Sequence, residues 1–171
     1  QAPPLRLRDD TGRLLTSHEL AGQPFLLLAP APLAEVPLQV PVGRSTFATA
    51  QPDPKTRLQQ VEDVIAETGA DVRLLVVALP YVQGGVLWDA ASVASSLREQ
   101  LAVSVFEDES GAFMKTYGQF VSRQNPLLLF GADGRILDAY VDMAKGQAAF
   151  VGIEEAPELA DGLLRIGQGQ R

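Results

Sequence analysis

Two apolar runs constrain the fold more than any other feature of the chain. Residues 25–29 read Phe-Leu-Leu-Leu-Ala, and residues 72–79 read Val-Arg-Leu-Leu-Val-Val-Ala-Leu. Nearly continuous apolar runs are typical of strands buried on both faces, as in a parallel sheet. Residues 54–68 between them have helical periodicity, and the apolar positions that share one face are Leu58, Val61, Val64 and Ile65. The sequence therefore predicts a βαβ unit with parallel strands and a right-handed crossover.

Short elements are predicted on both sides of this unit. Further strands are predicted at residues 5–8, 13–15, 103–106, 127–130 and 136–141. Helical segments are predicted at residues 16–20, after Asp89, and at residues 113–118 and 157–166. Gly69 is predicted to end the helix at residues 54–68. On the last helix, the residues predicted to face inward are Leu159, Leu163 and Leu164. Residues 80–88 are predicted to be a loop and residues 107–111 a turn. Asp133-Gly134 suits a two-residue type I′ hairpin turn.

The size and charge of the chain limit the classes of protein to consider. Its 171 residues predict one domain, residues 1–171, long enough to bury a core without metal or disulfide. The formal net charge is −7, with no basic cluster, so we expect no nucleic-acid partner. No run reaches 18 apolar residues, so we expect no membrane insertion. The chain begins with Gln1, which fits either a trimmed chain or one matured by signal removal, and the compartment stays open.

The chain contains no cysteine and one histidine, His18. The missing thiols exclude disulfides, thiolate nucleophiles and cysteine-bound metals in this chain. We therefore predict no catalytic residue, no metal and no cofactor.

His18 is predicted to lie at the surface of a capped turn, and Trp88 to be a core or half-buried anchor. Carboxylates at residues 107–109 are predicted to be a solvated helix-start cluster rather than a cation site, and Asp138 and Asp142 an exposed strand face.

The segment from residue 30 to residue 54 is unusual because it contains six of the 12 prolines. This density prevents a helix and favours extended backbone. Its length exceeds that of an ordinary loop, so it is either a rigid surface loop or an arm that docks a partner. Extended segments can add to a sheet edge or fill a groove. The candidate docking residues, which alternate with prolines and polar residues, are Leu33, Val36, Leu38, Val40 and Val42.

The order of these elements and several local strings resemble the thioredoxin fold as elaborated in peroxiredoxins and membrane-anchored thioredoxin-like proteins. The matching strings are Ala2-Pro3-Pro4-Leu5 with Asp10-Thr11-Gly12, residues 15–24, Lys115-Thr116-Tyr117-Gly118, and residues 125–136. The resemblance covers nearly the whole chain and implies an α/β thioredoxin-like fold: a central mixed sheet flanked by helices, with an N-terminal β-hairpin. It also implies that Pro126 is cis and faces the site where the family has its active cysteine.

The chain departs from the family at that cysteine. Peroxiredoxins have Pro-x-x-x-Thr-x-x-Cys after the first core strand. Aligned from Pro30, this chain has Ala34 and Pro37 in the Thr and Cys places, and aligned from Pro41 it has Ser45 and Ala48. A serine or threonine hydroxyl cannot replace a thiolate without a nearby base. The candidate residues of a vestigial or binding site are Ala29, Pro30, Ser45, Thr46, Thr49, Arg123, Asn125 and Pro126.

Three functions are compatible with these residues. The first is a redox-inactive thioredoxin-like module that acts by binding a protein partner or by self-association. The second is a small-molecule binder or non-thiol enzyme that uses the vacated site near Pro126. The third is a thiol peroxidase or oxidoreductase by descent whose chemistry has been lost. We favour the first and expect no enzymatic activity.

Overall fold

A computed structural model describes residues 5–30, 32, 38–42, 45–49, 54–83, 86–109, 111, 113, 115, 127–140 and 156–167. Seven strands form one sheet in the order β11-β10-β3-β6-β9-β1-β2. Their bounds, in chain order, are β1 (Arg6–Arg8), β2 (Leu14–Thr16), β3 (Phe25–Leu28), β6 (Arg73–Ala78), β9 (Val105–Asp108), β10 (Leu127–Phe130) and β11 (Ile136–Tyr140). The sheet is mixed, because β3, β6 and β9 are parallel while the other pairs are antiparallel.

The predicted βαβ unit forms the centre of the molecule. β3 pairs parallel to β6, with Leu27 opposite Leu75. The helix between them, α2 (Pro54–Thr68), has the predicted bounds, and Gly69 ends it with a φ of +65°. The N-terminal hairpin of β1 and β2 is also confirmed, and β1 joins it to the main sheet by pairing with β9.

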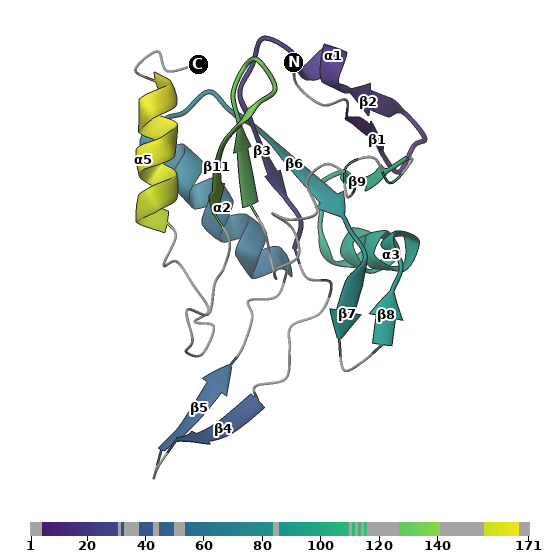
Figure 1. The fold of residues 1–171 in the computed structure, drawn as a ribbon, viewed down its shortest axis with the longest axis vertical. Coiled ribbons are helices and arrows are strands. Elements are labelled where there is room, and N and C mark those ends of the chain that lie inside the picture. The colour runs from purple at the N-terminus through teal and green to yellow at the C-terminus, as the bar shows by residue number, and fades with distance from the viewer. Residues whose placement is uncertain are drawn as a thin grey trace.

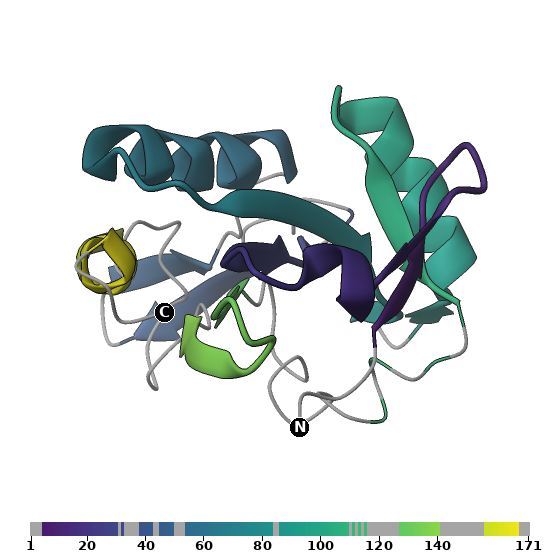
Figure 2. The same ribbon diagram turned by 90° about the horizontal axis from the view of Figure 1, so that it is seen from above.

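Alternate residues of the central strands supply two core faces. Leu26 and Leu28 of β3 pack on the face covered by α2, α3 (Ala90–Gln100) and α5 (Ala156–Gly167). Phe25 and Leu27 pack on the other face, together with Leu20 of the short helix α1 (Ser17–Leu20). Figures 1 and 2 show α2 and α3 on the same side of the sheet. None of the described helices is long and apolar enough to cross a membrane.

The C-terminal helix corrects one packing prediction. Leu163 is buried as expected, but Leu164 is 48% exposed. Ile166 is buried instead, and it lies three residues after Leu163, the spacing of one helical face. Leu159 has no described side-chain environment.

The two loops that join antiparallel strands of the main sheet have the same backbone geometry. In the β10–β11 loop, the Gly134 amide donates to the Gly131 carbonyl (2.9 Å), and Gly134 has a φ of +82°. This is a three-residue loop with glycine in the left-handed region, so the prediction of a two-residue type I′ turn is wrong although the hairpin is confirmed. In the β1–β2 loop, the Gly12 amide donates to the Asp9 carbonyl (3.1 Å), and Gly12 has a φ of +87°.

Two further predictions are corrected by strand pairing. Residues 80–88 were expected to be a loop, but β7 (Tyr81–Gln83) and β8 (Val86–Trp88) pair as an antiparallel hairpin. Glu107 and Asp108, expected in a turn, lie in β9, because β1 pairs with them through Arg8 and Leu7. Lys115 and Phe113 are helical as predicted, whereas residues 116–118 lie outside the described part of the chain.

Part of the proline-rich segment forms a hairpin of its own. β4 (Leu38–Val42) pairs antiparallel with β5 (Ser45–Thr49), with Val40 opposite Phe47. The expectation of extended backbone is thus confirmed for these ten positions. The pair is a separate two-stranded sheet, and Figure 1 shows it beyond the end of the main sheet at which β3 ends. We call β4 and β5 with their connection, residues 38–49, the arm.

Candidate functional site

The candidate site lies where β3 ends and β10 begins. Leu28, the last residue of β3, is opposite Leu127, the first residue of β10. Ala29 and Pro30 follow β3 directly and are both buried. The carboxyl ends of parallel strands are where open α/β sheets bind ligands. This edge of the sheet is therefore the first place to look for chemistry.

The residues described at this edge are chemically inert. Ala29 presents a methyl group and Pro30 a ring without a backbone donor, so neither can act as nucleophile, base or metal ligand. Arg123, Asn125 and Pro126 lie outside the described residues, and so does the peptide bond expected to be cis. Ala29 and Pro30, the two candidates that the structure describes at this edge, therefore supply shape and backbone carbonyls rather than reactive side chains.

The candidate hydroxyls belong to the arm and not to the main sheet. Ser45, Thr46 and Thr49 are positions of β5, in the separate two-stranded sheet. Of the candidate docking residues, those at alternate positions of β4 are Leu38, Val40 and Val42. Leu33 and Val36 lie outside the described residues. The described hydroxyls and the described docking residues thus lie together in the arm, whereas Ala29 and Pro30 follow β3 of the main sheet.

A partly buried contact holds the chain where it leaves the end of β3. The Pro32 carbonyl accepts a hydrogen bond from Gln100 Nε2 (2.7 Å) and a longer one from Ser96 Oγ (3.5 Å). Gln100 Nε2 also donates to Ser96 Oγ (3.0 Å), so the two side chains of α3 act as one unit. Pro32 is itself buried. The polar pair at positions i and i+4 of α3 could have suggested this contact, but sequence analysis did not identify it.

Arg57, in the first turn of α2, is the one charged residue among those described that is fully buried, with 2% of its surface exposed. Guanidinium groups stay ionised in proteins, and burial of an ion is costly unless protein groups compensate it. α2 begins soon after the arm, so a buried positive charge lies at the arm end of this helix. The sequence pattern gave the inner face of α2 as apolar and missed Arg57.

The carboxylates at residues 107–109 stabilise the fold. Glu107 Oε2 accepts from Arg98 Nη1 (3.2 Å), and Asp108 Oδ2 accepts from the Phe113 amide (2.9 Å). Glu109 forms ion pairs with Arg8 and with Arg6, the latter at 2.9 Å from Arg6 Nε. The hydrogen bonds from these arginines, of which the one from Arg8 has the larger effect, hold the pKa of Glu109 below its usual range. The prediction of a solvated helix-start cluster holds only for Asp108, because arginines bind Glu107 and Glu109 instead. The described residues contain no group of three His, Asp or Glu side chains that could hold a metal ion.

Other sequence candidates have structural positions. His18 is exposed on α1, as predicted, and Trp88 is partly buried against the core face that α3 covers. Asp89 caps α3, accepting from the Ser92 amide (2.8 Å), which lowers its pKa. Asp138 is a position of β11, and Asp142 lies outside the described residues.

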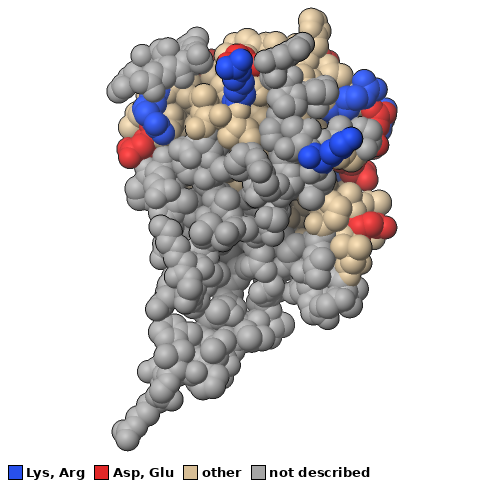
Figure 3. Space-filling model, in the orientation of Figure 1, with Lys and Arg blue, Asp and Glu red and all other residues tan. Residues whose placement is uncertain are grey.

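In Figure 3, blue and red side chains lie beside one another on the visible face, with no continuous basic patch among the described residues.

Comparison with known proteins supports the fold and nothing narrower. No protein-family model and no curated protein sequence matches the chain. Among solved structures, the exposed lipoprotein thioredoxin Etrx1 of Streptococcus pneumoniae is 15% identical with a TM-score of 0.58, over 95% of this chain and 98% of that one. A thioredoxin-like protein from Porphyromonas gingivalis is 18% identical with a TM-score of 0.56, over 100% and 94%. Yeast Sco1 with copper bound is 13% identical with a TM-score of 0.57, over 99% and 94%.

These likenesses and the strand order define the class of the molecule. The chain has the thioredoxin-like fold found in thioredoxins and peroxiredoxin-type proteins. It has no cysteine. Because thiol–disulfide exchange and thiol peroxidation both require a thiolate, the chain carries the fold without the group on which that chemistry depends.

Proposed function

We propose that this chain is a redox-inactive thioredoxin-like module that binds a protein partner through its arm, residues 38–49. The observation that carries the proposal is the pairing of β4 and β5 with each other and with no other described strand. The arm follows the point where β3 ends, which is where the sequence lacks the family's cysteine. Under the proposal, the proline-rich segment after β3 binds a partner at the place where the cysteine nucleophile is missing.

The energetics of an isolated hairpin favour a partner. A two-stranded hairpin alone is marginally stable in water, and three or more strands are usually needed. β4 and β5 each have an outer edge that no described strand occupies. A partner that adds a strand would satisfy backbone groups along one edge, and apolar residues at alternate positions would give specificity. Pro41 removes one donor from β4, so β5, which has no proline between Ser45 and Thr49, is the better edge.

The attachment of the arm also supports binding. Gln100 and Ser96 hold the Pro32 carbonyl against α3, close in sequence to the start of the arm. An arm whose base is fixed loses less conformational freedom when it binds, which favours affinity. The alternative function is the binding of a small molecule in the vacated site near Pro126. The experiment described next distinguishes this function from the binding of a protein partner.

The first experiment is native mass spectrometry of the protein isolated from its source cells. Under the proposal, the chain carries a stoichiometric second protein or forms a defined homo-oligomer. Replacement of residues 31–50 by a short Gly-Ser linker should abolish that assembly. A small bound mass that persists without any protein partner would instead assign a small-molecule binder.

A matched pair of point variants tests which surface binds. Phe47→Pro removes a backbone donor from β5 and should weaken the assembly at least tenfold. Leu87→Asp changes the most exposed large apolar side chain among the described residues, 68% exposed on β8, and should leave the assembly intact. Loss of assembly with Leu87→Asp and retention with Phe47→Pro would place the interface outside the arm and refute the proposal.

A further inference from the structure

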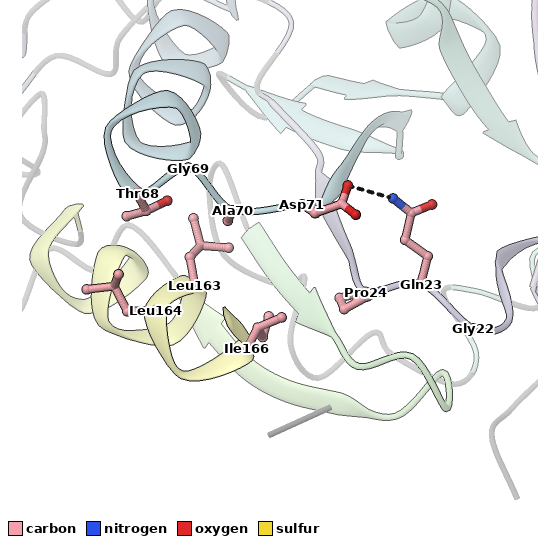
Figure 4. A pocket seen from close by; sticks show the side chains of 10 residues that line it. All are labelled: Gly22, Gln23, Pro24, Thr68, Gly69, Ala70, Asp71, Leu163, Leu164 and Ile166. Carbon is pink, nitrogen blue, oxygen red and sulfur yellow. Dashed lines mark hydrogen bonds between the residues drawn. The ribbon is translucent and has the colours of Figure 1, made fainter. Parts of the chain in front are cut away.

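We propose that a cavity at the opposite end of the sheet binds a small organic cation, an alkylammonium ion with a short apolar chain. The cavity has a volume of about 420 Å³ and is lined by residues 22–24, residues 68–71, Leu163, Leu164 and Ile166. Pro24 precedes β3 and Asp71 precedes β6, so the cavity lies at the amino ends of these parallel strands. Figure 4 shows it between α5, the end of α2 and the segment leading into β3. The inference is independent of the function proposed for the arm.

The apolar part of the cavity comes mainly from α5. Leu163 points toward the end of α2 in Figure 4, and both Leu163 and Ile166 are almost completely buried, at 1% and 4% exposure. Pro24 is also buried, while Leu164 is 48% exposed. An alkyl chain of a few carbons would cover apolar surface here, and this burial favours binding.

The polar side chains of the lining include two acceptors without a donor to offer, Thr68 and Asp71. α2 ends at Thr68, and a helix carboxyl end carries partial negative charge on carbonyls that lack helical partners. The last turn of α2 contains no basic residue to offset that charge. Thr68 Oγ1 commits its hydrogen to the carbonyls of Val64 (3.0 Å) and Ile65 (3.1 Å), so toward a ligand this hydroxyl can only accept.

Asp71 and Gln23 complete the acceptor set. Gln23 Nε2 lies 3.4 Å from Asp71 Oδ1, an arrangement that leaves the second carboxylate oxygen and the Gln23 amide oxygen as acceptors. None of the described lining residues is basic. The nearest basic residues in sequence are Arg73 and Arg165, both exposed and outside the lining. A ligand with several donors, a positive charge and an apolar chain fits this surface, whereas a carboxylate or phosphate does not.

The test uses three probes of equal chain length: hexylammonium, hexanol and hexanoate. Each is titrated into the ¹⁵N-labelled full chain, and amide shifts of residues 22–24 and 68–71 are followed. Hexylammonium should bind saturably and about fivefold more tightly than hexanol, with hexanoate not binding. Equal shifts with all three probes, or no saturation with hexylammonium, would overturn the proposal.

Variants connect the binding to this cavity. Asp71→Asn should weaken hexylammonium binding by up to about fivefold, the upper end of the range for an exposed ion pair. Leu164→Lys places a competing ammonium beside the acceptors and should abolish binding, while the exposed position tolerates the change. The control, Asp161→Asn, removes an exposed carboxylate of α5 outside the lining and should change nothing. Equal weakening in Asp161→Asn and Asp71→Asn would show a general charge effect and refute a built site.

A lysine side chain is the other source of the same chemistry. N-acetyl-lysinamide carries an ammonium on a four-carbon chain attached to amides. We expect it to bind more weakly than hexylammonium, because its amides would have to lose hydration at an acceptor-rich rim. Equal or tighter binding of N-acetyl-lysinamide would overturn the assignment to a free amine.

Discussion

Gly12 determines the geometry of the loop between β1 and β2. Its φ of +87° lies in the left-handed region, and a Cβ added there would meet no atom within 4 Å. Substitution therefore tests backbone conformation without a steric clash. Asp9 Oδ1 supports the same loop by accepting from the amides of Thr11 and Arg13, each at 2.9 Å.

We predict that Gly12→Ala lowers the free energy of unfolding by about 1 kcal/mol, the usual penalty for a side chain in this region. Gly12→Asn should lose less, because asparagine tolerates left-handed backbone. Urea unfolding at neutral pH measures both. Equal stability of Gly12→Ala and the unaltered protein would mean that the loop changes its conformation at no cost.

Glu109 joins two arginines of β1 to the end of β9, and its pKa is lowered from the ordinary 4.5 by hydrogen bonds from Arg8 and Arg6. A lowered pKa means that the folded protein favours the carboxylate. The stabilisation is fully present above pH 4.5 and is lost as the pH falls through the lowered value. Glu109→Gln should therefore be less stable at pH 7 and should lose less stability on acidification below pH 4.5.

Unfolding curves from pH 7 to pH 3 check this prediction. Glu99→Gln, a change at an exposed position of α3, is the control and should follow the unaltered protein. If the curves for Glu109→Gln and the unaltered protein run parallel throughout, the two arginines contribute nothing to the acid response.

Among the elements, the arm is a separate two-stranded sheet, as the β7–β8 hairpin also is. It pairs with no strand of the main sheet, whereas β3 pairs on both sides. Replacing residues 38–49 by a short Gly-Ser linker should therefore leave the melting temperature within about 3 °C, because changes in loop length cost little entropy. Leu27→Ala, in the fully buried β3, should cost about 2–5 kcal/mol and serves as the positive control. A shortened variant that melts as low as Leu27→Ala would show that the arm is part of the main core.

The elements that sequence predicted well are those whose signal is local. The continuous apolar runs of β3 and β6 and the periodicity of α2 gave the central unit and its parallel pairing. β7 and β8 were missed because Pro80 and the pair Gly84-Gly85 are typical of loops. The end of β9 was missed because its charged residues look like a turn until arginines from other elements pair with them.

The candidate site was less predictable than the fold. The missing cysteine and the long proline-rich segment could be read directly from the sequence. The acceptor-lined cavity could not, because residues 22–24, 68–71 and 163–166 are far apart in sequence and become neighbours only when α5 packs beside α2. The same applies to the contact of Gln100 with Pro32, which joins positions 68 residues apart.

On the scale of the whole molecule, β3 joins the two core faces. Its four residues are all buried and alternate between the two faces. Phe25 also stacks on Phe130 of β10, with ring centroids 4.4 Å apart and planes within 7°. Loss of β3 would expose apolar surface on both faces at once, so we expect both faces to unfold in one cooperative step.

Native-state hydrogen exchange would reveal this hierarchy. Amides of β3, β6 and β10 should exchange slowest, at rates set by global unfolding, because these strands are central and buried. Amides of the edge strands β2 and β11 should exchange faster, because only one neighbouring strand protects them. Amides of the arm should exchange fastest, because its hairpin pairs with no strand of the main sheet. Addition of the partner should slow exchange in β5 more than in β4, because β5 has the edge without proline. Slow exchange in the free arm, equal to that of β3, would mean that the hairpin needs no further strand and would remove the energetic reason for a partner.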